Sequence, residues 1–357
     1  MSKRIIHAFI IGIGVSVIGL AAGKKDPTSQ KTTIPDLLTR MNINRVDLPL
    51  ENNGSTGDNG RGYYPNGTNL AFLFSGGLAT TGLVNGDLRA SWMAPASLIE
   101  EWQPGIWGMD PEDPLAKFYE VSSEDDFGSP AYVEWSDAVA LGANFIDLNG
   151  DGLYDPNVDR PELLGDKTIW TPINDGTPIS RRTPRLGTPP MGLEINQTVW
   201  AYHPGGPLED VIFFRYQIIN TDSGDVDSLI FSIWEDPDIG DHEDDLIACD
   251  TMADMGFIYN DGVDLYYGAN PPAFGIKLLQ GAVVNSPGDT AFVFEKTLAG
   301  IDTIVDHRNL TMTSFMTYIN GDPIIGDPFN SIVARNYQVG GFDMHGNPID
   351  PTQWGVG

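Results

Sequence analysis

The chain is poor in cysteine and histidine, and each shortage excludes a class of site. Its one cysteine, Cys249, rules out an intramolecular disulfide. The five histidines are scattered, and none lies in the HExxH pattern of metalloproteases or in a recognisable Ser/His/Asp setting. One cysteine with scattered histidines also cannot supply the usual ligand sets of structural zinc sites.

Positive charge is also scarce. There are 20 Lys and Arg against 49 Asp and Glu, a formal net charge of −29. Nucleic acid and anionic lipid surfaces are therefore poor partners. Divalent cations would relieve much of the self-repulsion, so we expect calcium ions as partners and a stability that depends on them.

The first 23 residues have the composition of a secretory signal peptide. Lys3 and Arg4 precede an apolar run at 5–22, which ends in the small residues of 21–23. A membrane anchor is the alternative because the run is nearly long enough to span a bilayer, but the small-residue exit favours cleavage. Cleavage leaves 18 Lys and Arg against 49 acids, no stable transmembrane segment and an extracellular or outer cell-surface location.

One stretch indicates a chemistry by residue type and spacing together. From Asp147, side-chain oxygens recur at alternate positions, and Gly152 supplies a turn, as in the first nine positions of the EF-hand calcium loop. The twelfth position is Val158, so the closing carboxylate is expected one residue later, and Pro156 and Pro161 rule out a regular helix after the loop. The predicted calcium ligands are Asp147, Asn149, Asp151, the Leu153 carbonyl, Asp155 and Asp159.

The alternative is a solvated turn, since Asp, Asn and Gly favour turns for backbone reasons alone. Carboxylates aimed at one point would repel one another without a cation, which favours calcium.

A second acidic block occupies 235–245, with seven acids in eleven residues. A second calcium site would explain the crowding, and a solvated turn that blunts a sheet edge is the alternative. The candidate ligands are Asp236, Asp238, the Gly240 carbonyl, and Asp244 or Asp245.

The pattern of apolar residues predicts a mostly β protein. Beyond residue 191 short β-branched and aromatic runs alternate with turn residues, which indicates an antiparallel β-sandwich, with an immunoglobulin-like arrangement as one form of it. The runs at 211–219 and 229–234 predict a hairpin with each other. We expect a loop-rich β region at 24–190 and a sandwich domain at 191–357. The predicted strands are 193–202, 211–220, 228–235, 255–259, 273–284, 291–294 and 312–319.

Several motifs in order look like the amino-terminal part of a family of large secreted proteins of Gram-negative bacteria that commonly end in a type IX secretion sorting domain. The acidic block with its Cys249-Asp250-Thr251 is the most specific of them. The family has no established activity, so the resemblance implies secretion and surface display and nothing catalytic. The chain ends at 354–357 without a sorting domain, and we expect a truncated carboxyl end. The other segments are 65–67, 75–78, 82–89, 147–159, 161, 165–170, 174–175, 192–202, 232–240 and 313–323.

Two functions follow as hypotheses. The favoured one is a secreted, calcium-stabilised structural or adhesion protein without catalytic activity, whose candidate partners include other surface proteins. The alternative is a protein that binds polysaccharide or hydrolyses glycosides, in which some of the 8 Trp and 12 Tyr stack on sugars and Glu194 with Glu235 or Asp236 forms a carboxylate pair.

Overall fold

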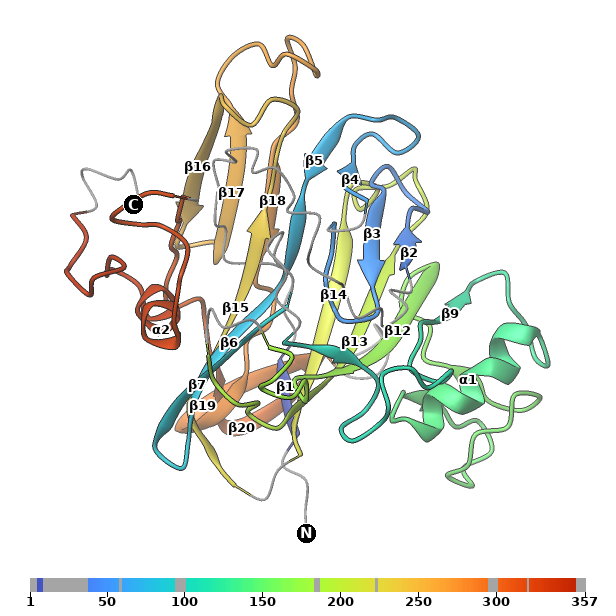
Figure 1. Ribbon diagram of the computed structural model, residues 1–357. Helices are drawn as coiled ribbons and strands as arrows, with labels where there is room; N and C mark the ends of the chain where they lie inside the picture. Colours follow the sequence, from blue (N-terminus) through green and yellow to red (C-terminus); the bar gives the residue numbers. More distant parts are fainter. Residues whose placement is uncertain are drawn as a thin grey trace.

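Antiparallel strands make up most of the regular structure of the chain (Figure 1). The computed structural model describes residues 38–57, 60–93, 101–182, 187–221, 224–294, 301–319 and 321–350, and the backbone of 5–8. All strand pairs within this part of the chain are antiparallel, which confirms the predicted mostly β class and is consistent with a sandwich.

The largest sheet has the order β1-β14-β13-β12-β8, with β9 also paired to β12. Its strands are β1 (Ile5–Ala8), β14 (Ile212–Asn220), β13 (Leu193–Ala201), β12 (Lys167–Asn174), β8 (Gln103–Pro104) and β9 (Tyr119–Ser122). The predicted division between 190 and 191 falls between β12 and β13, which pair along their length from Lys167↔Ala201 to Asn174↔Glu194.

A second sheet has the order β15-β6-β7. Its strands are β15 (Val226–Asp236), β6 (Ser75–Val84) and β7 (Asp87–Trp92). A two-residue turn joins β6 to β7, and both its residues, Asn85 and Gly86, have positive φ (54° and 86°), as the tight turn of a hairpin requires. Leu78 and Ile233 of this sheet share one buried core with Ile195 of β13, so the two sheets bury their apolar faces together.

The remaining strands form small sheets, and two helices cover parts of the core. Figure 1 shows α1 (Pro130–Ala140) and α2 (Ser331–Val339) on opposite sides of the molecule. The small sheets are β2 (Leu38–Met41) with β3 (Leu48–Glu51), β4 (Gly62–Tyr63) with β5 (Ala71–Leu73), β10 (Phe145–Ile146) with β11 (Arg160–Pro161), β16 (Asp245–Asp250) with β17 (Met255–Asn260) and β18 (Phe274–Lys277), and β19 (Val283–Phe294) with β20 (Ile301–Asn309).

The amino-terminal end of helix α1 is determined by its sequence. Ser129 caps its first turn by accepting a hydrogen bond from the Tyr132 N–H, and Pro130 suits the first helical position because that position has no intrahelical N–H bond to lose. Tyr132 and Trp135 then pack against Trp170 of β12 in a separate buried cluster.

Three strand predictions are wrong. The strand predicted at 273–284 is divided between β18, which ends at Lys277, and β19, which begins at Val283. The strands predicted to form a hairpin, β14 and β15, lie in different sheets, because β14 pairs with β13 and β1 while β15 pairs with β6. A bulge in β15 between Asp227 and Ile230, with Ser228 at a φ of 51°, accompanies this pairing. Residues 312–319 form no strand.

Candidate calcium-binding loops

The first candidate loop connects the two short strands β10 and β11, as the sequence predicts for a calcium loop without a second helix. Phe145 pairs with Pro161 and Ile146 with Arg160, so the two ends of the loop are held side by side. All six predicted ligands, residues 147 to 159, therefore lie in a single closed segment, which is exposed along most of its length and buried at Asp159.

Within this loop each early side chain accepts hydrogen bonds from main-chain N–H groups further along. The two carboxylate oxygens of Asp147 accept from Gly150 (2.6 Å) and Gly152 (2.8 Å), which have φ values of 78° and 77°. Asn149 Oδ1 accepts a hydrogen bond from the Asp151 N–H at 3.0 Å, and Asp151 Oδ1 accepts one from the Leu153 N–H at 2.8 Å. The hydrogen bonds that Asp147 accepts, that from Gly152 first and that from Gly150 after it, hold the pKa of Asp147 below its usual value.

Asp159 closes the loop from its far end. It is fully buried, unlike the exposed Asp151. Its two oxygens accept from the N–H groups of Leu148 and Asp155, both at 2.9 Å, so one carboxylate ties the start of the loop to its last turn. Asp159 therefore closes the loop through hydrogen bonds, and its predicted role as the closing calcium ligand stays a prediction.

The predicted ligands of the first loop have the atom types that calcium prefers, but their side chains are not placed around one point. Carboxylate, amide and carbonyl oxygens are the ligands that calcium prefers, and here they alternate along a closed loop. Over the described residues, however, no group of three or more His, Cys, Asp or Glu side chains is placed so that it could hold a metal ion. Both predicted ligand sets, in the first loop and in the block at 235–245, therefore stay predictions, and binding in the first loop requires side chains such as Asp151 to turn inward.

The first half of the second acidic block, residues 235–239, is buried, whereas residues 240–245 are half-buried or exposed. Beyond β15 the chain continues alongside β5, where the Asp238 N–H donates to the Phe72 carbonyl at 3.1 Å and the Gly240 N–H to that of Ala71 at 3.0 Å. Asp236 and Asp238 are only 1% and 4% exposed. The description as a solvated turn therefore does not hold for this part of the block.

Of the two alternative ligands at the end of the block, Asp245 is the one that faces the buried acids. Its Oδ2 accepts from the Ile239 N–H at 2.9 Å, and its buried Oδ1 has no hydrogen-bond partner. Burial, followed by the charges of Asp244, Asp238 and Asp264, raises the pKa of Asp245 to about 7, against the lowering effect of the Ile239 bond. Asp244 is exposed and accepts a hydrogen bond from Asn260.

Asp264 belongs to this cluster but was missed by the sequence analysis. It is 1% exposed and accepts from the N–H groups of Asp241 (2.8 Å) and Tyr266 (2.7 Å). Its Oδ1 lies 2.4 Å from where a Cβ of Gly240 would be, so the glycine makes room for the carboxylate. No local pattern marks Asp264, because its partner segment lies more than twenty residues earlier in the chain.

The predicted glycosidase pair is not formed across a sheet. Glu194 of β13 is buried and accepts a hydrogen bond from the Trp107 N–H at 2.7 Å. Glu235 lies on β15 in the other sheet. Burial, with a contribution from Asp236, raises the pKa of Glu235 well above its usual value.

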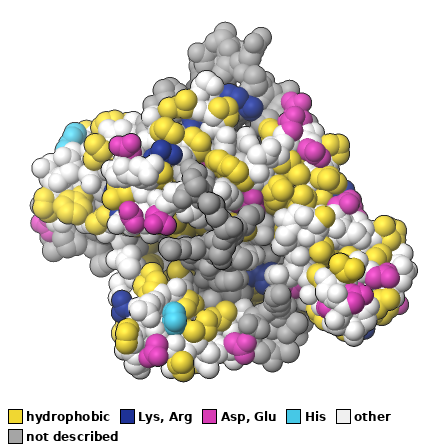
Figure 2. Space-filling model, turned by 90° about the horizontal axis from the view of Figure 1, so that it is seen from below, with side chains coloured by type: hydrophobic (Ala, Val, Ile, Leu, Met, Phe, Trp, Pro, Cys, Tyr) yellow, Lys and Arg dark blue, Asp and Glu magenta, His cyan; other side chains and the backbone are white. Residues whose placement is uncertain are grey.

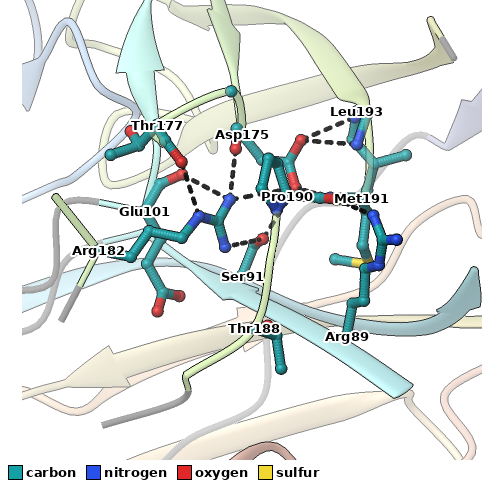
Figure 3. Close-up of polar contacts among 12 residues, drawn as sticks. Arg89, Ser91, Glu101, Asp175, Thr177, Arg182, Thr188, Pro190, Met191 and Leu193 are labelled. Carbon is teal, nitrogen blue, oxygen red and sulfur yellow. Dashed lines mark hydrogen bonds and ion pairs between the residues drawn. The ribbon is translucent and has the colours of Figure 1, made fainter. Parts of the chain in front are cut away.

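A buried polar network surrounds Asp175, at the end of β12 (Figure 3). The Asp175 carboxylate accepts from the main-chain N–H groups of Met191 (2.6 Å), Gly192 (3.0 Å) and Leu193 (2.9 Å) and from Ser91 Oγ (2.9 Å). It therefore fixes the start of β13 against the end of β12 and against β7.

Arg182 completes this network from the proline-rich stretch that precedes β13. Its Nη2 lies 3.5 Å from Asp175 Oδ2, its Nε donates to the Thr177 carbonyl at 2.9 Å, and its Nη1 donates to Ser91 Oγ at 3.1 Å (Figure 3). Nη2 also donates to the Glu101 carbonyl at 3.3 Å. Burial lowers the pKa of Arg182, and the charge of Asp175 acts in the opposite direction.

Comparisons of the chain with known protein families, with curated proteins and with solved structures found no match. The family resemblance therefore stays a prediction. No helix in the described part of the chain is long and apolar enough to cross a membrane. The signal peptide predicted at 1–23, apart from the backbone of 5–8, and the truncated end predicted at 354–357 lie outside the described residues.

Proposed function

We propose that the protein is a secreted, calcium-stabilised structural or adhesion protein of the extracellular space or cell surface, without catalytic activity. The observation that carries this proposal is the burial of Asp238 and Asp264, which are 4% and 1% exposed, next to Asp245, whose pKa their charges help to raise. Among the described residues these side chains do not form a metal-binding group as they stand, so binding requires them to turn toward one ion. Carboxylates gathered out of water repel one another, and burial raises the pKa of Asp238 as well as that of Asp245. A bound divalent cation would favour the ionised forms of Asp238 and Asp245.

In this proposal the second site takes Asp238, Asp245 and the Gly240 carbonyl as ligands, with Asp236 and Asp264 beside them. The positive charge of calcium would offset the negative charges of these carboxylates. The loop would then be held against β5 by the ion as well as by its main-chain hydrogen bonds.

The first site takes the oxygens of the loop between β10 and β11. Asp147 and Asp159 already reach across that loop to N–H groups at its other positions. Calcium binding would replace part of this hydrogen bonding with coordination and would close the surface segment beside α1.

The molecular surface agrees with a role outside the cell. On the face seen in Figure 2, acidic side chains are scattered among hydrophobic ones and basic side chains are fewer. An excess of negative charge keeps a protein soluble and disfavours binding to nucleic acid.

The aromatic side chains do not favour the polysaccharide alternative. Six tryptophans are buried in the structure, and of those described Trp107 alone is exposed, at 36%. Core packing therefore accounts for most of them. The buried tryptophans are Trp92, Trp102, Trp135, Trp170, Trp200 and Trp234.

Calcium dependence is tested by thermal unfolding in chelator and in millimolar calcium. We expect calcium to raise the Tm of the wild type, because a ligand that binds only the folded state stabilises it. The rise should shrink in the Asp147→Asn/Asp159→Asn variant and in the Asp238→Asn/Asp245→Asn variant. A control that removes two exposed carboxylates, at Asp227 and Asp302, should keep the full rise.

A Tm that is the same in chelator and calcium would refute the calcium part of the proposal. Turnover of any glycan in a polysaccharide panel, abolished by the Asp238→Asn/Asp245→Asn variant, would refute the non-catalytic part. Export is tested separately: the amino terminus of protein recovered from the culture medium should begin near residue 24, so the exported protein should lack β1 and leave β14 as an edge strand of the largest sheet.

A further inference from the structure

A largely apolar pocket of about 680 Å³ opens between the two main sheets. Phe72 of β5, Phe214 of β14, Ile233 of β15 and Phe274 of β18 contribute to its walls. This volume is within the range of about 300–1,000 Å³ that is typical of small-molecule sites.

One end of the pocket is polar and has no partner within the protein. Glu235 and Thr56 both line it and are 8% and 3% exposed. Glu235 Oε2 and Thr56 Oγ1 are buried side-chain oxygens without a hydrogen-bond partner. A buried acceptor without a donor carries a desolvation cost that a bound donor would remove.

The two oxygens meet over a single residue, Gly76 of β6, which pairs with Glu235. A Cβ at Gly76 would lie 1.8 Å from Glu235 Oε2 and 2.7 Å from Thr56 Oγ1. The absence of a side chain at Gly76 therefore allows both oxygens to occupy the same end of the pocket. Tyr216 of β14 also lines it and is 3% exposed.

The charges around the pocket favour a positively charged ligand head. Asp210 lines the pocket as well as Glu235, and the chain as a whole carries a formal charge of −29. Lys277 is the one lysine among the lining residues, and its ammonium donates a hydrogen bond to the Ala253 carbonyl at 2.6 Å. An anionic head would meet a carboxyl group and unpartnered acceptor oxygens at the buried end.

We propose that this pocket binds a small amphipathic amine, with its apolar body between the two sheets and its ammonium group against Glu235 Oε2 and Thr56 Oγ1. The aromatic and aliphatic walls supply the hydrophobic contact. The two oxygens accept hydrogen bonds that only a donor-bearing head can provide. This site is distinct from the candidate calcium ligands and goes beyond the structural function proposed above.

The test is isothermal titration calorimetry of the full chain at one fixed calcium concentration with n-octylamine, 1-octanol and octanoate, which share a chain length and differ in the head group. Octylamine should bind most tightly and octanoate least. Glu235→Gln should weaken octylamine binding by at least about tenfold, because a bound ammonium favours the ionised carboxylate of Glu235 and an amide cannot ionise. Glu124→Gln, at an exposed position, makes the same chemical change outside the pocket and should leave binding unchanged.

Thr56→Val provides a second variant of nearly the same shape in case Glu235→Gln does not fold, and it should also weaken octylamine binding. Circular dichroism of each variant verifies the fold before titration. The proposal is overturned if none of the three compounds binds, if octanoate binds as tightly as octylamine, or if octylamine binding is unaffected in whichever of these variants folds.

Discussion

Replacing Arg182 by methionine should destabilise the protein far more than the same replacement at its neighbour Arg181. The two residues have the same charge and adjoin each other in the proline-rich stretch before β13. Arg182 is 5% exposed, whereas Arg181 is exposed. Arg181→Met is therefore a matched control for the loss of one positive charge.

The expected loss of folding free energy depends on the buried groups that lose their partner when Arg182 is removed. Removal of its guanidinium takes the ion-pair partner from Asp175, which is buried at 0% exposure, and takes donors from the Thr177 and Glu101 carbonyls. Breaking a buried ion pair by removing one partner costs about 3–5 kcal/mol. Asp175 keeps its three main-chain donors and Ser91, which places the expected cost toward the lower part of that range.

Urea unfolding followed by tryptophan fluorescence measures the difference. A domain is stable by about 5–15 kcal/mol in all, so the midpoint of Arg182→Met should fall clearly below that of the wild type. Arg181→Met should stay within about 0.5 kcal/mol of the wild type, as is usual at the surface. If the two variants unfold at the same urea concentration, the buried network does not hold this stretch in place.

Two further predictions concern the acidic groups. Burial raises the pKa of Asp245 to about 7 in the folded chain, against an ordinary value of 3.8. Between these two pH values the folded state therefore binds more protons than the unfolded state. In chelator, the free energy of unfolding should consequently fall as the pH rises from about 4 to about 7. Urea titrations at several pH values should show a shallower fall in Asp245→Asn, and an unchanged slope would contradict the assignment. Gly76→Ala should lower stability by about 1–3 kcal/mol through overpacking against Glu235. Thermal melts should show partial recovery in a Gly76→Ala/Glu235→Ala double variant, and a neutral Gly76→Ala would contradict the close approach.

Three long strands, β13, β14 and β15, were predictable from sequence, but the pairing of β14 and β15 was not. Alternating β-branched and aromatic residues mark β13, β14 and β15 to within a few residues. The turn residues at 220–225 fit a hairpin, yet β15 pairs with β6, whose sequence lies far upstream. Pairing is decided by which faces must be buried together, and a local pattern does not contain that information.

The same distinction applies to the candidate sites. The first loop was found because all its ligands fall within one short stretch, where spacing alone indicates calcium. Asp264, Thr56 and Gly76 come from segments that meet only in the folded chain. Arg182 lies in a proline-rich stretch, which is typical of a surface loop, and no local signal distinguishes this buried arginine from its exposed neighbour Arg181.

Cys249 on β16 gives the molecule a built-in reporter of local opening. It is a half-buried free thiol, opposite Gly256 of β17. Burial, with the charges of Asp250 and Asp254, raises the pKa of its thiol, so the folded chain presents little reactive thiolate. A thiol reagent should label it mainly when β16 separates from β17. Because it is the chain's only cysteine, the labelling rate with and without calcium would report how firmly the strand that follows the acidic block is held, without any engineered probe.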